Sequence, residues 1–329
     1  MTEKNLVTAI RDTLHDEMAA DDRIVLIGQD VGARGGVFKV SEGFMAEFGE
    51  QRVVDAPLAE SGIVGVAIGM ALHGLLPIAE IEFADFIHPA FDQILSEASR
   101  MRYRTNGDWG CPMVIRAPCG GGIHGALYHS QSIEAFYAHI PGVKVVMPST
   151  PADAAGLLHT AIADPDPVLF LEHKKCYRVI KGEVPDVPQA TPIGKADVKR
   201  EGTDLTVVSY GYDLHRCLDA AARLEEDEGI HAEVVDVRSL APLDTETILA
   251  SVRKTARAMV VYEDNRTYGA GAEIAATIAE QAMFDLDAPI VRIGGPDIPA
   301  MPFAAALEHY YMEPEPDHIF VAMRDLAHF

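Results

Sequence analysis

The chain has 329 residues, of which 48% are hydrophobic and 23% charged, and its formal net charge is −23. This length and balance predict two globular domains with substantial cores and exclude a fibrous or disordered chain. The negative charge excludes nucleic acid and anionic membranes as natural partners. It fits either a basic protein partner or a surface that only aids solubility.

No segment predicts a membrane span, because the longest uncharged apolar run is about Ile63 to Leu72 and a span needs roughly 18–20 residues. The N-terminal residues carry neither a signal-peptide pattern nor an Arg/Ser-rich transit pattern, so we expect a cytoplasmic, bacterial-type protein. The four cysteines include no CxxC pair and are expected to be free thiols in a reducing compartment.

The first half of the chain alternates β-branched runs with longer helical patterns, for example at residues 62–73 and 89–103. The runs are nearly continuously apolar, which is typical of parallel strands covered by helices on both faces. The expected strands are residues 23–30, 52–58, 77–83, 112–118, 144–149 and 168–173.

A passage rich in proline, lysine and glycine follows, and Pro185, Pro188 and Pro192 argue against any regular element there. We therefore predict a domain at 1–180, a linker at 181–200 and a second α/β domain at 201–329. The second domain restarts the pattern and should end in a helix. Its expected elements are strands at 205–211, 232–238, 258–264 and 289–295 and a last helix at 317–328.

Several strong motifs are absent from the sequence. No GxGxxG follows a strand, so an NAD-linked dehydrogenase has no support, and neither a Walker loop nor HExxH occurs. His124 and His129 are five residues apart, which does not put two zinc ligands on one helical face.

Glu60 follows the strand that ends near Leu58 and should stand in the first turn of a helix. In open parallel sheets ligands bind at the carboxyl ends of the strands, so a working carboxylate would stand here. A glutamate at this place also stabilises a helix N-terminus by its charge alone, and local features favour that simpler interpretation.

The helix after Glu60 carries Gly62, Gly65 and Gly69 close to one face. Each glycine inside a helix costs roughly 1 kcal/mol relative to alanine. We therefore expect this face to pack closely against another backbone, within the chain or between subunits.

The segment 117–139, APCGGGIHGALYHSQSIEAFYAH, combines three consecutive glycines with nearby histidines and serines. It is either a functional loop with a titratable imidazole or a glycine-rich turn with surface histidines, and local features do not separate the two.

Long segments in order resemble the β subunits of the thiamine-diphosphate-dependent 2-oxoacid dehydrogenases. EIEFADFIHPAFDQI and HGALYHSQS resemble the branched-chain members more than the pyruvate members, although Ile133 stands where proline is common. The resembling segments include DVGARGGVFKVSEG (30–43), DAPLAESGIVGVAIGMALHG (55–74), HSQSIEAFYAHIPGVKVVMPSTPADAAGLL (129–158) and DVRSLAPLDTETI (236–248).

The resemblance implies a transketolase-like pyrimidine-binding domain with a parallel sheet, followed by a transketolase C-terminal-like α/β domain. Enzymes of this kind hold the diphosphate and Mg²⁺ with a GDG motif, which this chain lacks, since NGDWG (106–110) is only superficially similar. An α subunit in an α2β2 heterotetramer should supply that half of the site.

Carried over by position, Glu60 is the carboxyl that hydrogen-bonds the pyrimidine ring of thiamine diphosphate, and proton sharing would suit that role. Phe86 would pack against the ring and Leu58 would line the same pocket. His129 would orient the 2-oxoacid or assist proton transfer.

The resemblance further implies a monovalent cation, K⁺, held by backbone carbonyls and a carboxylate. The matching positions are Met113, Val114, Ala161, Asp164 and Asp166.

The activity implied is oxidative decarboxylation of branched-chain 2-oxoacids with transfer of the acyl unit to the lipoyl group of an acyltransferase. The acyltransferase would dock by a basic subunit-binding domain. The stretch from Glu201 onward has 24 acidic and 9 basic residues, which suits that partner, and Phe329 lies in the region expected to dock. The same role for pyruvate or acetoin, and a non-catalytic assembly subunit, remain the alternatives.

Overall fold

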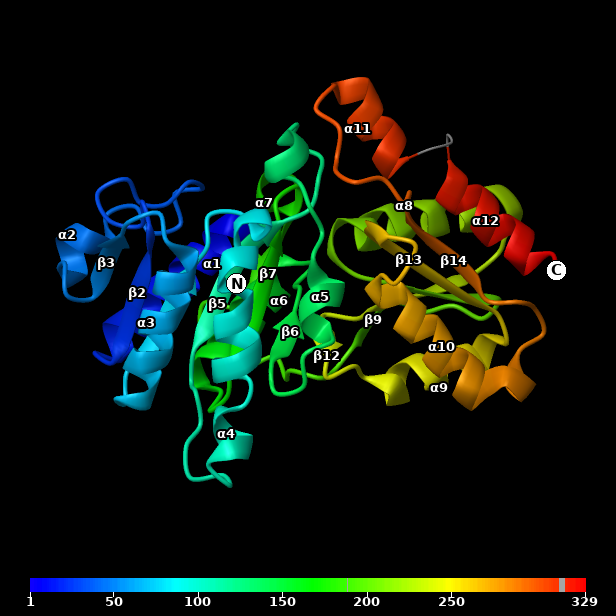
Figure 1. Ribbon diagram of the computed structural model, residues 1–329. Helices are drawn as coiled ribbons and strands as arrows, with labels where there is room; N and C mark the ends of the chain where they lie inside the picture. The colour runs from blue at the N-terminus through cyan, green and yellow to red at the C-terminus, as the bar shows by residue number, and fades with distance from the viewer. Residues whose placement is uncertain (188, 314–316) are drawn as a thin grey trace. The chain divides into compact units, whose positions relative to one another are not determined.

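The computed structural model describes residues 1–187, 189–313 and 317–329, which divide into two units (Figure 1). The first unit comprises Met1–Cys119 and Phe136–Ile193, and the second comprises Gly120–Ala135 and Gly194–Phe329. Nothing in the local pattern of residues 120–135 indicates that they group with the second unit. The predicted boundaries at 1–180 and 201–329 stay predictions.

The first unit is built on parallel strands in the order β6-β7-β5-β4-β2-β3. Every residue of β5 and β7 is buried, as the continuous apolar runs predict. The strands are β2 (Ile24–Gln29), β3 (Val53–Ala56), β4 (Leu76–Glu80), β5 (Val114–Cys119), β6 (Lys144–Val146) and β7 (Val168–His173).

Helices flank these strands, with α1 packed on α6 and α3 packed on β4. The expected helix at 62–73 is confirmed as α3. In the part of the chain that the structure describes, no helix is both long and apolar enough to cross a membrane. The helices are α1 (Leu6–Ala20), α2 (Phe44–Phe48), α3 (Glu60–Leu72), α4 (Met101–Arg104), α6 (Pro151–Ala163) and α7 (Cys176–Val179).

The single helix expected at 89–103 is instead three pieces: the 3₁₀ turn η2 (His88–Ala90), the π-helix η3 (Gln93–Ala98) and α4. The amide of Ser99 donates to the Ile94 carbonyl at 3.0 Å, five residues back, and the Ser99 hydroxyl bonds the Leu95 carbonyl at 2.7 Å. A π turn widens the helix locally and interrupts α-helical periodicity, so the sequence pattern did not reveal it.

The second unit has a sheet in the order β14-β13-β10-β11-β9, parallel except for β9 at one edge. Its strands are β9 (Asp197–Arg200), β10 (Leu205–Ser209), β11 (Ala232–Asp236), β13 (Ala258–Asn265) and β14 (Val291–Gly295). Its longer helices are α8 (Gly211–Glu228), α9 (Thr245–Thr255), α10 (Ala270–Ala282), α11 (Ala305–Met312) and α12 (His318–Ala327).

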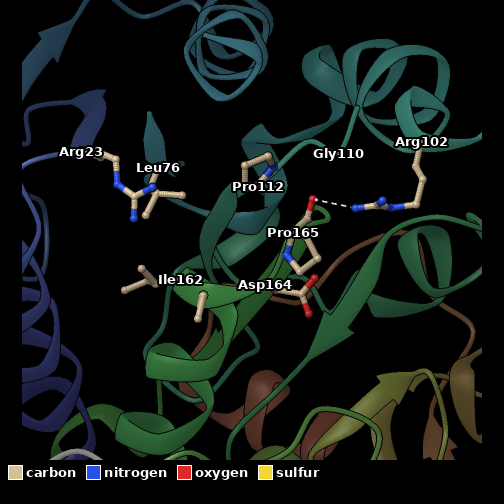
Figure 2. Close-up of a pocket in the computed structure, with 9 residues that line it drawn as sticks. Arg23, Leu76, Arg102, Gly110, Pro112, Ile162, Asp164 and Pro165 are labelled. Carbon is tan, nitrogen blue, oxygen red and sulfur yellow. Dashed lines mark hydrogen bonds between the residues drawn. The ribbon is translucent and has the colours of Figure 1, made fainter. Parts of the chain in front are cut away.

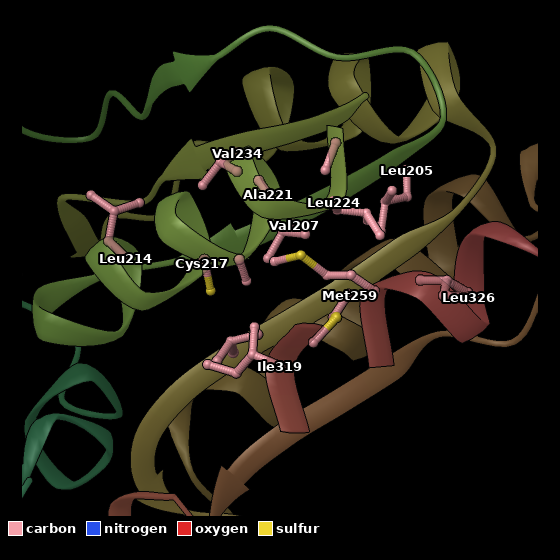
Figure 3. Close-up of a cluster of buried hydrophobic side chains, with 14 of the residues drawn as sticks. Leu205, Val207, Leu214, Cys217, Ala221, Leu224, Val234, Met259, Ile319 and Leu326 are labelled. Atoms are coloured by element: carbon pink, nitrogen blue, oxygen red, sulfur yellow. The ribbon is translucent and has the colours of Figure 1, made fainter. Parts of the chain in front are cut away.

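The core of the second unit lies between this sheet and helices α8 and α12. Figure 3 shows Leu224, Met259 and Ile319 among the side chains that gather there. The expected final helix at 317–328 is confirmed as α12.

Two short strands occupy the segment expected to be free of regular structure. β8 (Lys181–Val184) pairs antiparallel with β1 (Thr2–Asn5), and β9 joins the second sheet. The expectation was wrong because Pro185 and Pro192 stand outside these strands, where their missing amide costs no ladder bond. Pro188 lies outside the described residues.

All four cysteines are free and buried, as expected. Burial raises the pKa of the Cys111 thiol to about 12, and it also raises the pKa of Cys217. Thiols kept protonated in this way are inert packing groups rather than nucleophiles.

A buried ion network lies inside the first unit. Arg116 on β5 is 1% exposed and donates to both carboxylate oxygens of Glu172 on β7, at 2.7 and 3.0 Å, and to Glu80 on β4 at 2.6 Å. Tyr177 donates its hydroxyl to Glu172. Burial raises the pKa of Glu80 despite this guanidinium.

Candidate active site

Glu60 is the first residue of α3 and follows the carboxyl end of β3, as predicted. Its carboxylate is half-buried, and the preceding Ala59 offers no side-chain cap to the helix. The next residue, Ser61, donates its hydroxyl to the Pro89 carbonyl and so ties the start of α3 to η2. Glu60 thus stands on a fixed helix end, where the helix dipole favours its negative charge.

Phe86 ends the 3₁₀ turn η1 (Ala84–Phe86), just before η2, which packs on α3. Its ring meets that of Phe83 edge to face, with centroids 5.7 Å apart at 79°. Leu58, by contrast, is 74% exposed. The first unit therefore brings the Glu60 helix end and the Phe86 segment together, with Leu58 open to solvent.

Glu82 is a second carboxyl in this region that the sequence analysis missed. Its pKa is raised by burial and then by the carboxylates of Asp30, Glu80 and Glu60. β2 and β4 are neighbours, so Asp30 and Glu82, each just past a strand end, come to one edge of the sheet. An acidic residue shortly after each of two adjacent strands is the signal that could have identified them.

His129 belongs to the second unit and follows the 3₁₀ turn η4 (Ala126–Tyr128). Its Nδ1 lies 3.2 Å from the Gly125 carbonyl, which can only accept, so a neutral ring carries its proton on Nδ1. In that tautomer Nε2 is the basic nitrogen. The Gly120 amide donates to the Gln131 carbonyl at 3.0 Å and closes the loop.

The second unit also holds a buried carboxyl cluster that the sequence did not reveal. Glu134 is buried and accepts a hydrogen bond from the Tyr210 hydroxyl at 2.9 Å. Burial, reinforced by the charge of Asp264, raises the pKa of Glu134 to about 8. Burial likewise raises the pKa of Asp264 to about 6. Burial in this cluster therefore favours the protonated form of Glu134.

The five residues predicted to hold a cation all lie in the first unit. Val114 begins β5, the Met113 carbonyl accepts from the Val168 amide at 3.0 Å, and the Ala161 carbonyl accepts from Asp164 at 3.3 Å. Of the predicted carboxylates, Asp166 pairs with Arg102 at 2.7 Å.

Both carboxylates are partly buried and already paired with a cationic side chain: Asp164 with Lys144 at 2.6 Å, and Asp166 with Arg102. The lysine supplies the positive charge there, so the side chains fit an additional cation poorly. Within the described ranges no group of three or more His, Cys, Asp or Glu side chains could hold a metal ion. The K⁺ site stays a prediction.

A surface pocket of about 430 Å³ opens beside Asp164 (Figure 2). Arg102 donates to the Pro165 carbonyl at 3.4 Å along its wall. The other lining residues are Arg23, Leu76, Gly110, Pro112, Ile162 and Ala163. None of the residues predicted to bind the thiamine cofactor lines it.

The glycine-bearing face of α3 has few partners inside this chain. A side chain at Gly65 would meet Gln93, whereas one at Gly69 would meet nothing within 4 Å, and Val66 is exposed. Among the residues that the structure describes, none packs closely against the backbone at Gly69.

Comparison with known proteins identifies both units. The transketolase pyrimidine-binding domain family matches residues 2–179, and the transketolase C-terminal domain family matches residues 194–319. A split-gene transketolase, solved as an inactive β4 tetramer, superposes with a TM-score of 0.79 at 26% identity over 98% of each chain. The predicted transketolase-like fold is confirmed.

Similar sequences extend over the whole chain. The 2-oxoisovalerate dehydrogenase subunit beta of Bacillus subtilis (strain 168) is 56% identical over 329 residues, which is all of both chains. The pyruvate dehydrogenase E1 component subunit beta of the same strain is 49% identical over 93% of this chain and 94% of its own. The pyruvate dehydrogenase E1 component subunit beta of Acholeplasma laidlawii is 48% identical over 98% of this chain and 97% of its own.

Proposed function

Because the chain belongs to the β subunits of the thiamine-diphosphate-dependent 2-oxoacid dehydrogenases, we propose that its substrates are branched-chain 2-oxoacids. The observation that carries this proposal is the comparison within one organism. The 2-oxoisovalerate subunit of B. subtilis is 56% identical and the pyruvate subunit 49%. The pyruvate or acetoin enzyme is the alternative.

When bound, thiamine diphosphate supplies the nucleophilic carbon and electron sink that decarboxylation of a 2-oxoacid requires. The residues at the α3 end fit the pyrimidine half of this cofactor, since a half-buried carboxylate stands near an aromatic segment. Glu60 would hydrogen-bond a ring nitrogen and share a proton with it, and Phe86 would pack on the ring face.

The diphosphate and Mg²⁺ would be held by an α subunit. The sequence has no GDG motif, and the described residues include no carboxylate cluster suited to a metal. The unpartnered stretch of α3 around Val66 and Gly69 supports a subunit contact there, in an α2β2 heterotetramer.

His129 would bind the 2-oxoacid carboxylate or move a proton at the reacting carbon. With Nδ1 donating to Gly125, the ring would present Nε2 as its basic atom. A residue acting on substrate in this way also explains why a histidine stands in a glycine-rich loop rather than in the core.

The acyl unit would pass to a lipoyl group on an acyltransferase that docks on the second unit. The excess of acidic residues after Glu201 attracts a basic docking domain, and Phe329 is exposed at the C-terminal end. A cytoplasmic location, expected from the sequence, stays a prediction.

The test is decarboxylation of 3-methyl-2-oxobutanoate and of pyruvate with thiamine diphosphate and Mg²⁺, by the chain alone and co-purified with its α subunit. We expect turnover only in the pair, faster with the branched substrate. A preference for pyruvate would overturn the substrate assignment. Turnover by the chain alone would overturn the shared site.

Glu60→Gln separates a catalytic subunit from an assembly subunit. It keeps size and removes the acidic proton, so turnover should fall by about 10²–10⁴-fold, the range of acid–base catalysis. Glu50→Gln, at an exposed carboxylate on the same unit, is the matched control and should change nothing. Equal turnover in both variants would favour the assembly subunit.

A further inference from the structure

Two carboxylates of the second unit bind the backbone of the glycine-rich loop that carries His129. Glu263, on β13, accepts the Gly121 amide at 2.8 Å and the Ser132 hydroxyl at 3.0 Å. Glu308, on α11, accepts the amides of Gly122 at 2.9 Å and His124 at 3.1 Å. The loop is thus held by side chains far away in sequence.

The loop backbone has an unusual conformation. Every second residue from 120 to 126 has a positive, left-handed φ angle: Gly120 at 78°, Gly122 at 81°, His124 at 59° and Ala126 at 60°. Since His124 and Ala126 are not glycine, their conformation is strained and needs support from bonds outside the loop.

Glu308 provides that support from α11. It is 2% exposed, and its partners are the two loop amides and the ring of His124, which is itself 58% exposed. A buried carboxylate is costly unless it is hydrogen-bonded, so α11 and the loop hold each other in place.

The hydrogen bonds of Glu308 are linked to His129 through one intervening residue, Gly125. His124 is fixed by Glu308, and the next carbonyl, that of Gly125, accepts from Nδ1 of His129. The backbone is close-packed at Gly125, where a side chain would not fit because its Cβ would lie 2.6 Å from the His129 carbonyl and 2.7 Å from the Ser130 hydroxyl. The position of the Gly125 carbonyl therefore sets the tautomer and orientation of the imidazole.

We propose that Glu308 is a positioning residue for the reaction: it binds the Gly122 and His124 amides and thereby holds the His129 imidazole in its working orientation. The inference rests on the proposed function, because it takes His129 to act on the substrate. It assigns a task in the reaction to α11, which no sequence motif had indicated.

Hydrogen exchange tests the anchoring without reference to activity. The assembled α2β2 enzyme is compared as wild type, Glu308→Gln, which keeps an acceptor oxygen, and Glu308→Leu, which keeps none. Amides of 121–126 should exchange at least about 10-fold faster in the leucine variant and less so in the glutamine variant. Glu313→Gln, a half-buried carboxylate just beyond the same helix, is the control and should match wild type. Unchanged exchange in Glu308→Leu would overturn the anchoring.

A double-mutant cycle tests whether Glu308 acts through His129. We expect Glu308→Gln and Glu308→Leu to lower kcat progressively, and His129→Ala with Glu308→Leu to be no slower than His129→Ala alone. If the two substitutions instead lower kcat by factors that multiply in the double variant, Glu308 has a merely structural role and the proposal is overturned.

The two experiments separate this inference from the proposed function. If His129→Ala alone leaves turnover unchanged, the assignment of His129 fails, and with it the positioning role of Glu308. The exchange result would still decide whether Glu308 anchors the loop.

Discussion

Arg116 is the side chain whose loss should most destabilise the first unit. Arg116→Met keeps an unbranched side chain of similar length in β5 but removes three charge-assisted hydrogen bonds to Glu172 and Glu80, at 2.6–3.0 Å. Two buried carboxylates are then left without their cation. Removing one partner of a buried ion pair costs about 3–5 kcal/mol, because the remaining charge is desolvated and uncompensated.

The expected cost depends on pH in a defined direction. Burial already raises the pKa of Glu80, and without Arg116 this carboxyl should bind a proton more readily in the folded chain. A raised folded-state pKa means that stability is lost as the pH rises. The deficit of Arg116→Met should therefore be largest near pH 8 and smaller near pH 5.

Urea unfolding at the two pH values, followed by far-UV circular dichroism, measures this cost. Arg104→Met is the matched control, since Arg104 pairs with Glu97 at 2.8 Å on the surface and such pairs contribute under about 1 kcal/mol. If Arg116→Met unfolds at the same urea concentration as Arg104→Met, the buried network is not what stabilises this sheet.

Two further changes probe the second unit. The pKa of Glu134 is raised to about 8 by burial and Asp264, so the wild type should lose stability as the pH rises from about 5 to 8. Glu134→Gln, which resembles the protonated carboxyl, should reduce that loss in thermal melts between pH 5 and 8, leaving the part that Asp264 contributes; a pH dependence kept in full would refute the assignment. Leu224→Ala, in the core shown in Figure 3, should cost about 2–5 kcal/mol in urea unfolding. Leu307→Ala, at an exposed leucine, should cost far less, and equal losses would contradict the packing.

The order of strands and helices could be predicted because each element has its own local pattern of apolar residues. Buried parallel strands such as β5 and β7 need continuous apolar runs, and amphipathic or small-residue helices have their own period. Glu60 could be placed for the same reason, since a carboxylate just after a strand and at a helix start stands at the ligand-binding edge of a parallel sheet.

Predictions from local sequence patterns were wrong where a hydrogen bond that the pattern does not indicate decided which element forms. The π-helix η3 ends with a bond from the Ser99 amide to the Ile94 carbonyl, five residues back, and the strands β8 and β9 depend on partners elsewhere in the chain. A four-residue strand beside a proline-rich stretch is too short to show a period of its own. Its pairing partner decides whether it forms.

Amino-acid sequence alone therefore determined the fold class, the family resemblance and the candidate carboxylate Glu60. Tertiary structure alone decided which distant groups meet. Glu263 and Glu308 bind loop amides 142 and 186 residues away, and the pKa of Glu82 is raised by burial and by carboxylates that folding brings close to it. Hydrogen bonds and charge interactions of this kind depend on distance in space, which the spacing of residues along the chain does not encode.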